Sequence, residues 1–141
     1  MASLNDAERD CLQRYCALLE ERLGPRLVEV RMFGSAARGD MWPPHSPMHS
    51  DIDLLIVTVD DVAEDEQEAL INDTYPLYLE CGRQLSPHFY GEERLANPES
   101  EKTRDFLERV SPDAVVVWSA AGTRPRQGID VEKPRLGGAS P

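Results

Sequence analysis

The chain has 141 residues, enough for one domain of common size that buries a core without disulfides or a structural metal. Lysine and arginine total 15 and aspartate and glutamate total 26, so the formal net charge is −11. Nucleic acid is not expected as a tight ligand, because phosphate neutralisation needs a basic stripe and the sequence has no cluster of basic residues. The apolar runs are far shorter than the roughly 20 residues of a spanning helix, so no membrane role is expected.

The cysteines indicate a reducing compartment. Cys11, Cys16 and Cys81 are an odd number without a paired short spacing, which favours free thiols in a cytoplasmic protein over a disulfide framework. The first ten residues carry acids and no apolar core, so a signal peptide is not expected.

The first half of the chain predicts a helix, a strand, a turn and a second strand. Helical spacing of apolar residues predicts a helix over 6–23, which Gly24 and Pro25 end. Period-two alternation predicts a strand over 27–33. Its apolar face is expected to carry Val28, Val30 and Met32. A brief helix over 35–39 and a proline-rich loop over 40–50 precede a strand over 52–59. Its run of β-branched residues and leucines predicts burial on both faces beyond the start of the strand.

The second half continues the alternation of helices and strands. A helix over 60–80 must kink or break because it contains Pro76. A strand over 84–90, a helix capped at 97–99 that reaches Val110, and a strand over 114–118 follow. The order of elements predicts one α/β (α+β) domain over residues 1–120. Residues 121–141 are rich in Gly, Pro, Arg and Ser and are expected to form a disordered tail.

Two carboxylates stand together at the start of the second predicted strand. Asp51 and Asp53 are two residues apart, and side chains at this spacing point to the same face of a strand. Two carboxylates at such a short distance repel each other unless a cation lies between them, and paired oxygen ligands suit Mg²⁺. Taken alone, such a pair is more often simply an exposed strand end.

A phosphate-binding turn is predicted just upstream of this pair. Gly34 would let a phosphate approach the backbone closely, the amides that open the short helix would point at it, and Ser35 adds a hydroxyl donor. Arg38, about one helical turn further on, can bring a guanidinium to the same anion. Each part alone is an ordinary turn or surface charge, but together they predict a site for a metal-bound nucleoside triphosphate.

These two motifs carry a family resemblance. Residues 33–39 (FGSAARG) and 50–54 (SDIDL) resemble the signature of the DNA polymerase beta-like nucleotidyltransferase superfamily, in its branch of small "minimal" domains. The resemblance extends from the first helix to about Trp118. It implies a mixed β-sheet of about four strands flanked by helices, two divalent ions, and transfer of a nucleoside monophosphate from a triphosphate, with ATP expected, onto a hydroxyl.

The resemblance also implies roles for individual residues. Asp51 and Asp53 would bind Mg²⁺ and act in catalysis. The triphosphate would be bound by Gly34, Ser35, Arg38 and Ser50. Positions 36–50 form a longer insertion than the family usually has between its two motifs.

The predicted strand over 84–90 departs from the family. Active members usually place a third carboxylate there, and this strand has no acid. Alternation puts Ser86 and His88 on one face. If that face holds the site, His88 could serve as the general base, since its unperturbed pKa of roughly 6.5 suits proton transfer. The alternative is a partly buried strand histidine with a structural hydrogen bond.

Two functions therefore stay open. The first is a Mg²⁺-dependent nucleotidyltransferase whose acceptor is a protein partner, a small molecule or an RNA end. The second is a catalytically weak or inactive module that binds nucleotide or a partner, such as the antitoxin-like half of a toxin-antitoxin pair. Domains of this kind are often paired with a helical HEPN-type toxin or a helical substrate-binding protein. An aminoglycoside-type adenylyltransferase is a weaker possibility, because those enzymes carry further substrate-binding structure.

Overall fold

The structure is a computed structural model that describes residues 4–39, 41 and 51–120. Its helices and strands follow in the order α1 (Asp6–Leu23), β1 (Leu27–Phe33), α2 (Ser35–Arg38), β2 (Ile52–Thr58), α3 (Glu64–Asn72), α4 (Thr74–Cys81), β3 (Leu85–Gly91), α5 (Glu92–Ala96), α6 (Glu101–Val110) and β4 (Val115–Ser119). Ser50, nearly all of the predicted loop over 40–50, and the predicted tail over 121–141 lie outside the described residues.

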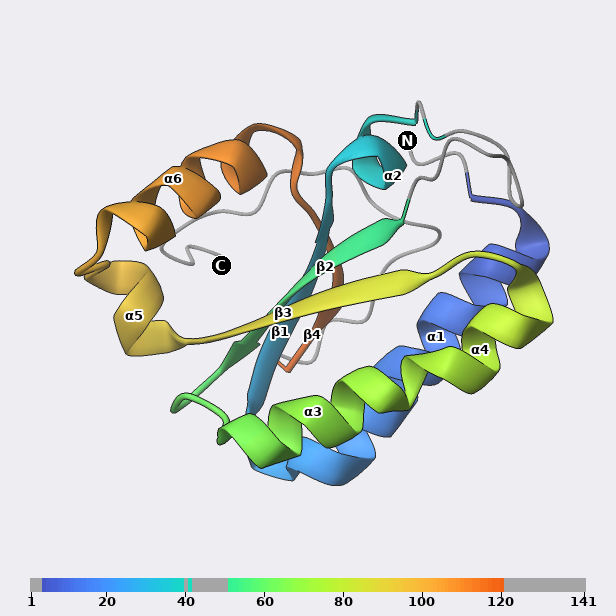
Figure 1. The fold of residues 1–141 in the computed structure, drawn as a ribbon, viewed down its shortest axis with the longest axis horizontal. Coiled ribbons are helices and arrows are strands. Elements are labelled where there is room, and N and C mark those ends of the chain that lie inside the picture. The colour runs from blue at the N-terminus through green and yellow to red at the C-terminus, as the bar shows by residue number, and fades with distance from the viewer. Residues whose placement is uncertain (1–3, 40, 42–50, 121–141) are drawn as a thin grey trace.

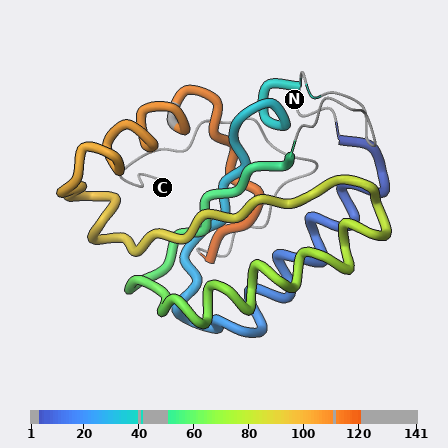
Figure 2. Tube along the Cα trace, in the orientation of Figure 1, coloured from blue at the N-terminus to red at the C-terminus, as the bar shows by residue number. Residues whose placement is uncertain are grey.

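The strands form one mixed sheet in the order β3-β2-β1-β4 (Figure 1). β1 is antiparallel to both β2 and β4, while β2 is parallel to β3. Antiparallel pairing brings the end of β1, which continues into α2, beside the start of β2 (Figure 2). The predicted mixed sheet of four strands flanked by helices is confirmed.

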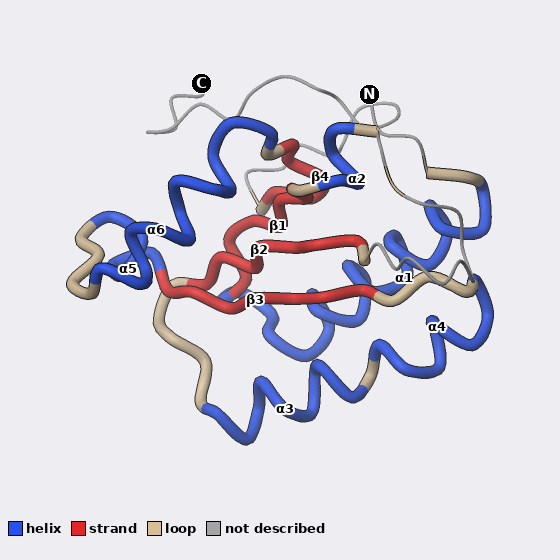
Figure 3. The backbone as a smooth tube through the Cα atoms, turned by 45° about the horizontal axis from the view of Figure 1, so that its top comes forward, coloured by secondary structure: helices blue, strands red, loops and turns tan. Residues whose placement is uncertain are grey.

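Helices cover both faces of the sheet. The layer of α1, α3 and α4 lies against one face, and α6 lies against the other (Figure 3). Each face of the sheet carries one cluster of buried apolar residues, and β2 contributes to both because its side chains alternate between the faces. Leu54 and Ile56 belong to the larger cluster, and Leu55 and Val57 belong to the smaller cluster under α6. The prediction that this strand is buried on both faces is confirmed.

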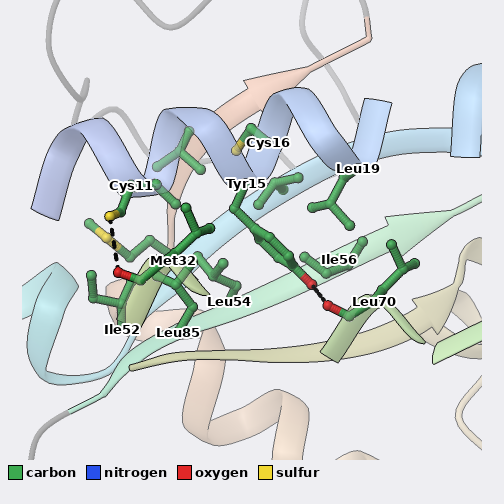
Figure 4. Packing of buried hydrophobic residues seen from close by; sticks show 14 of the residues in the cluster. Cys11, Tyr15, Cys16, Leu19, Met32, Ile52, Leu54, Ile56, Leu70 and Leu85 are labelled. Carbon is green, nitrogen blue, oxygen red and sulfur yellow. Dashed lines mark hydrogen bonds between the residues drawn. The ribbon is translucent and has the colours of Figure 1, made fainter. Parts of the chain in front are cut away.

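The larger core cluster is organised by α1 (Figure 4). The predicted apolar stripe of this helix is entirely buried: Leu12, Cys16, Leu19 and Leu23. The Tyr15 hydroxyl donates a hydrogen bond to the Leu70 carbonyl at 2.8 Å, and the Cys11 thiol donates to the Leu77 carbonyl at 3.4 Å. Because these carbonyls belong to α3 and α4, the three helices of this layer are tied together.

A buried ion pair joins α1 to the beginning of β3. Arg83 Nε donates to Glu8 Oε2 at 2.9 Å, and the two side chains are 5% and 2% exposed. The next residue, Gln84, accepts the Ile52 N–H at 2.9 Å through its carbonyl. The ion pair thus helps to fix the edge of the sheet where β2 and β3 begin.

The predicted helix over 60–80 is two helices, and the break is not at the proline. α3 begins at Glu64 and ends at Asn72, and α4 begins at Thr74. Pro76 lies in the first turn of α4, where a backbone N–H has no acceptor within the helix, so proline is tolerated there. Gly82 ends α4 in the left-handed conformation, at the predicted stop.

Two other local predictions need correction. The register of β1 with β2 shifts between Leu27 and Glu29, and Val28 packs with the cluster under α6 instead of facing the same way as Val30. The last helix begins at Glu101, not at 97–99, and Ser100 Oγ accepts the Thr103 N–H at 3.1 Å in its first turn. The short helix α5 was not predicted.

Candidate active site

The turn between β1 and α2 brings its backbone against a carboxylate. Gly34 has a φ of +76°, and a Cβ at this position would lie 2.6 Å from Oδ2 of Asp53. Any side chain here would strain the backbone and clash with the carboxylate. The close neighbour of Gly34 in the structure is thus the carboxylate of Asp53, which brings the two predicted motifs into direct contact.

The helix α2 holds the other predicted residues of this turn. Ser35 is its first residue and is half-buried, and its carbonyl accepts the Gly39 N–H at 2.8 Å. Arg38 is its last residue, exposed, with Nη1 3.4 Å from Oδ2 of Asp113. Ser35 and Arg38 thus belong to the same short segment that abuts Asp53, whereas Ser50 lies outside the described residues.

The carboxylates lie at the start of β2, next to the end of β1. Asp51 immediately precedes the strand and Asp53 is its second residue, so both belong to the same face. Asp53 pairs in register with Phe33 of β1 and with Ser86 of β3. Three adjacent strands, β1, β2 and β3, therefore meet at Asp53.

The electrostatics of Asp53 reflect this crowding. Burial and the charge of Asp51 raise the pKa of Asp53 to about 6, from its ordinary value of 3.8. The guanidiniums of Arg109 and Arg38 act in the opposite direction, and Arg109 has the larger effect of the two. A carboxylate with a raised pKa is one whose negative charge lacks full compensation, which a bound cation would supply.

Ser86 occupies the place on β3 where a third carboxylate is usual in the family. It pairs with Asp53, and the parallel register puts its side chain on the same face of the sheet. No cluster of three or more His, Cys, Asp or Glu side chains that could hold a metal ion occurs in the described part of the chain. The protein thus offers two carboxylates and a neighbouring hydroxyl.

His88 lies two residues after Ser86 on β3, on the same face of the sheet, and is packed among aromatic rings. Its ring centroid is 5.8 Å from that of Phe33 and 5.2 Å from that of Phe106. Burial and the positive charge of Arg109 lower the pKa of His88 below its ordinary 6.5. The imidazole is therefore neutral at neutral pH and could accept a proton.

The donor set fits a divalent cation. The carboxylates of Asp51 and Asp53 share one face, and the pKa of Asp53 is raised in part by the negative charge of Asp51. The bare Cα of Gly34 leaves one oxygen of Asp53 uncovered by a side chain. Hard oxygen ligands of this kind, with room for phosphate oxygens, are what Mg²⁺ takes in proteins.

Arg109 is a site neighbour that the sequence did not predict. It lies in the last turn of α6, where its guanidinium Cζ is 5.5 Å from the centroid of the Phe106 ring. No local pattern could have found it, because the chain carries many exposed arginines and only tertiary packing turns α6 toward the carboxylates.

Comparison with known proteins identifies the family. The family model described as "nucleotidyltransferase domain" matches residues 16–117, which include both motifs, the first three strands and the start of β4. The chain belongs to the nucleotidyltransferase domain family. The resemblance inferred from residues 33–39 and 50–54 is confirmed.

Curated relatives of this nucleotidyltransferase domain are aminoglycoside (3'') (9) adenylyltransferases. Those of Klebsiella pneumoniae and Escherichia coli are each 39% identical over 62 residues, which are 44% of this chain and 22% of the relative. The match thus spans about a fifth of the length of these relatives.

Solved structures with a similar fold include two variants of the toxin-antitoxin pair MntA-HpeT. Both align with a TM-score of 0.50, at 17% and 13% identity, covering 77% of this chain and 72% and 73% of those chains. At such low identity the likeness shows the fold of the nucleotidyltransferase domain alone.

No helix among the described residues has both the length and the apolar character needed to cross a bilayer.

Proposed function

We propose that this domain transfers a nucleoside monophosphate from Mg²⁺-bound ATP to a hydroxyl acceptor. The observation that carries the proposal is the contact between the two motifs, where the backbone of Gly34 meets the carboxylate of Asp53 beside Asp51. A turn that admits phosphate next to a pair of metal-binding carboxylates suits a metal-bound triphosphate. Membership of the nucleotidyltransferase domain family supports the reaction class.

The chain's own residues supply binding and orientation. Asp51 and Asp53 would hold Mg²⁺, which would neutralise the developing charge on attacking and leaving oxygens. Gly34 would allow the phosphates to reach the backbone, while the Ser35 hydroxyl and the Arg38 guanidinium would donate hydrogen bonds to them. Ser50, which precedes the first carboxylate, is proposed to contact the nucleotide as well.

The bonding changes are those of an in-line displacement. The acceptor hydroxyl oxygen bonds to the α-phosphorus, the bond from that phosphorus to the bridging oxygen breaks, and pyrophosphate leaves with the electron pair. We propose that the neutral imidazole of His88 takes the proton of the acceptor hydroxyl, since its lowered pKa leaves it unprotonated at neutral pH.

Ser86 favours a second candidate function. A serine where active relatives usually have a carboxylate removes one metal ligand, and a domain of this kind could bind nucleotide without turnover. The fold likeness to the MntA-HpeT structures agrees with an antitoxin-like role. The two functions differ in one measurable respect, which is transfer of the label from the nucleotide.

The deciding experiment uses the full chain with each α-labelled nucleoside triphosphate and Mg²⁺, alone and with the protein product of the adjacent reading frame. Transfer that is lost in Asp51→Asn and kept in Glu68→Gln, which removes an exposed charge on α3, supports the enzyme. If the wild type binds ATP but transfers nothing to any acceptor, while Ser86→Asp does transfer, the binding module is the correct description.

We further propose that the partner is a helical protein of the HEPN type with basic side chains around an apolar contact. The helices α3 and α4 expose three large apolar side chains, Ile71, Tyr75 and Leu79, at 42%, 59% and 63%. Exposed acids at the start of α3 and the net charge of −11 complement a basic surface. The three free cysteines support a cytoplasmic location for this pair.

Co-elution of the domain with the adjacent gene product tests the partner. The double variant Tyr75→Ser with Leu79→Ser should abolish co-elution and leave ATP binding intact, because both residues lie on the layer opposite the carboxylates. Retention of the complex by this variant would place the interface elsewhere.

A further inference from the structure

Arg109 is held over the same face of the sheet as the carboxylates. The Phe106 ring beneath its guanidinium packs against Phe33 at 5.6 Å and against His88 at 5.2 Å between centroids. The end of α6 that carries Arg109 points toward the end of the sheet where α2 lies and β2 begins (Figure 1). The end of α6 that carries Arg109 and the helix α2 thus lie at the same end of the sheet, where Arg38 pairs with Asp113 just after α6.

Arg109 is also unusual among the arginines in how little it binds. Within the described ranges it is the one arginine without an ion pair or a hydrogen bond, and its guanidinium lies over the Phe106 ring. Carboxylates pair with Arg14, Arg22, Arg26, Arg31, Arg38, Arg83 and Arg94, and backbone carbonyls accept from Arg9 and Arg104. In a chain with 26 acidic residues and 15 basic ones, an exposed guanidinium without an acceptor is available for an anion from outside.

Packing connects Arg109 to the carboxylates. The Phe106 ring beneath its guanidinium packs against Phe33, and Phe33 pairs in register with Asp53. A guanidinium in this position can attract an anion bound at the carboxylates.

We propose that Arg109 binds the triphosphate of the nucleotide together with Ser35 and Arg38. The phosphates then contact two guanidiniums, one from α2 and one from α6, next to the carboxylates. This inference rests on the proposed nucleotide-binding function and adds to it a residue outside both sequence motifs. Guanidinium suits the task because its planar donors match phosphate oxygens in pairs.

The alternative is that Arg109 only balances the negative charge of Asp51 and Asp53. In that case replacing Arg109 would change the stability of the free protein, but the change in affinity would not depend on the number of phosphates on the ligand. A phosphate-binding role predicts a loss that grows with the number of phosphates on the ligand.

The test measures the dissociation constants of Mg²⁺-ATP, AMP and adenosine by calorimetry with the full chain. Arg109→Met keeps an apolar stem over the Phe106 ring and removes the charge, so the fold should be retained. We expect Mg²⁺-ATP to bind about 10- to 100-fold more weakly, AMP to lose less, and adenosine to be unaffected. Arg109→Lys should give an intermediate loss, because a lysine keeps the charge without the paired donors.

The matched control is Arg104→Met on the same helix, which removes an exposed arginine that donates only to the Pro98 carbonyl. It should bind all three ligands as the wild type does. Equal affinity of wild type and Arg109→Met for Mg²⁺-ATP overturns this inference, and so does an equal loss for all three ligands. A wild type that does not bind Mg²⁺-ATP at all refutes the proposed function itself. Thermal melts of each variant separate loss of binding from loss of folding.

Discussion

Replacing Asp53 with asparagine should stabilise the metal-free protein. The pKa of Asp53 is raised from 3.8 to about 6 in the folded state, so folding favours its protonated form and the ionised form costs stability. That cost is absent below pH 4, grows as the pH rises through about 6, and is complete above it. Asparagine has nearly the same shape and carries no charge, so it removes the cost.

The size of the effect follows from the same values. A difference between pKa 3.8 and about 6 corresponds to about 3 kcal/mol if the side chain were shielded from water. Asp53 is partly exposed, and solvent screening reduces the expected gain for Asp53→Asn to about 1–2 kcal/mol at pH 8. At pH 4 the gain should nearly vanish.

Urea denaturation of wild type and Asp53→Asn between pH 4 and pH 8, without divalent ions, measures this directly. Glu68→Gln is the control for net charge, because it removes one exposed carboxylate from α3. Added Mg²⁺ should stabilise the wild type and leave Asp53→Asn unchanged, since binding to the folded state alone adds to its stability. A variant no more stable than Glu68→Gln at pH 8 would show that Asp53 is not under electrostatic stress.

Three further predictions concern the turn, the third position and the buried ion pair. Gly34→Ala should weaken Mg²⁺-ATP binding in calorimetry, because the new Cβ would lie 2.6 Å from the carboxylate of Asp53. The control is Gly24→Ala, at a residue with a φ of +57° and no atom within 4 Å of the new Cβ. It should lower the free energy of unfolding by only about 1–2 kcal/mol and leave binding intact. In label-transfer assays His88→Ala should lower the rate of nucleotide transfer by about 10²–10⁴-fold if His88 is the general base. Ser86→Asp should raise that rate if Ser86 stands at the position of a missing metal ligand. An unchanged rate in both variants would contradict both assignments. Arg83→Met should destabilise the fold by about 3–5 kcal/mol in urea denaturation, because it leaves a buried carboxylate unpaired, and a loss below 1 kcal/mol would argue against that reason.

Local patterns in the sequence determined most of the elements and the centre of the site. Period-two alternation located the strand over 27–33 and an apolar run located the strand over 52–59, because both patterns depend on which faces of a strand are buried. All four predicted strands lie within one residue of the observed ones. The two-residue spacing of Asp51 and Asp53 placed them on one face for the same reason. The sequence indicated Gly34 as a turn that lets a phosphate approach the backbone, and the structure adds that Oδ2 of Asp53 lies against the same position.

Other features depend on how distant segments pack, which local patterns do not contain. The helix over 60–80 breaks at Asp73 and not at Pro76, because proline is tolerated in the first turn of a helix, where its missing N–H has no acceptor. Ser86 lies beside Asp53 only because β2 and β3 pair in parallel, and this register joins residues 33 positions apart in the chain. Arg109 reaches the carboxylates because the Phe106 ring anchors α6 on that face of the sheet, and no residue near Arg109 in the sequence records this contact.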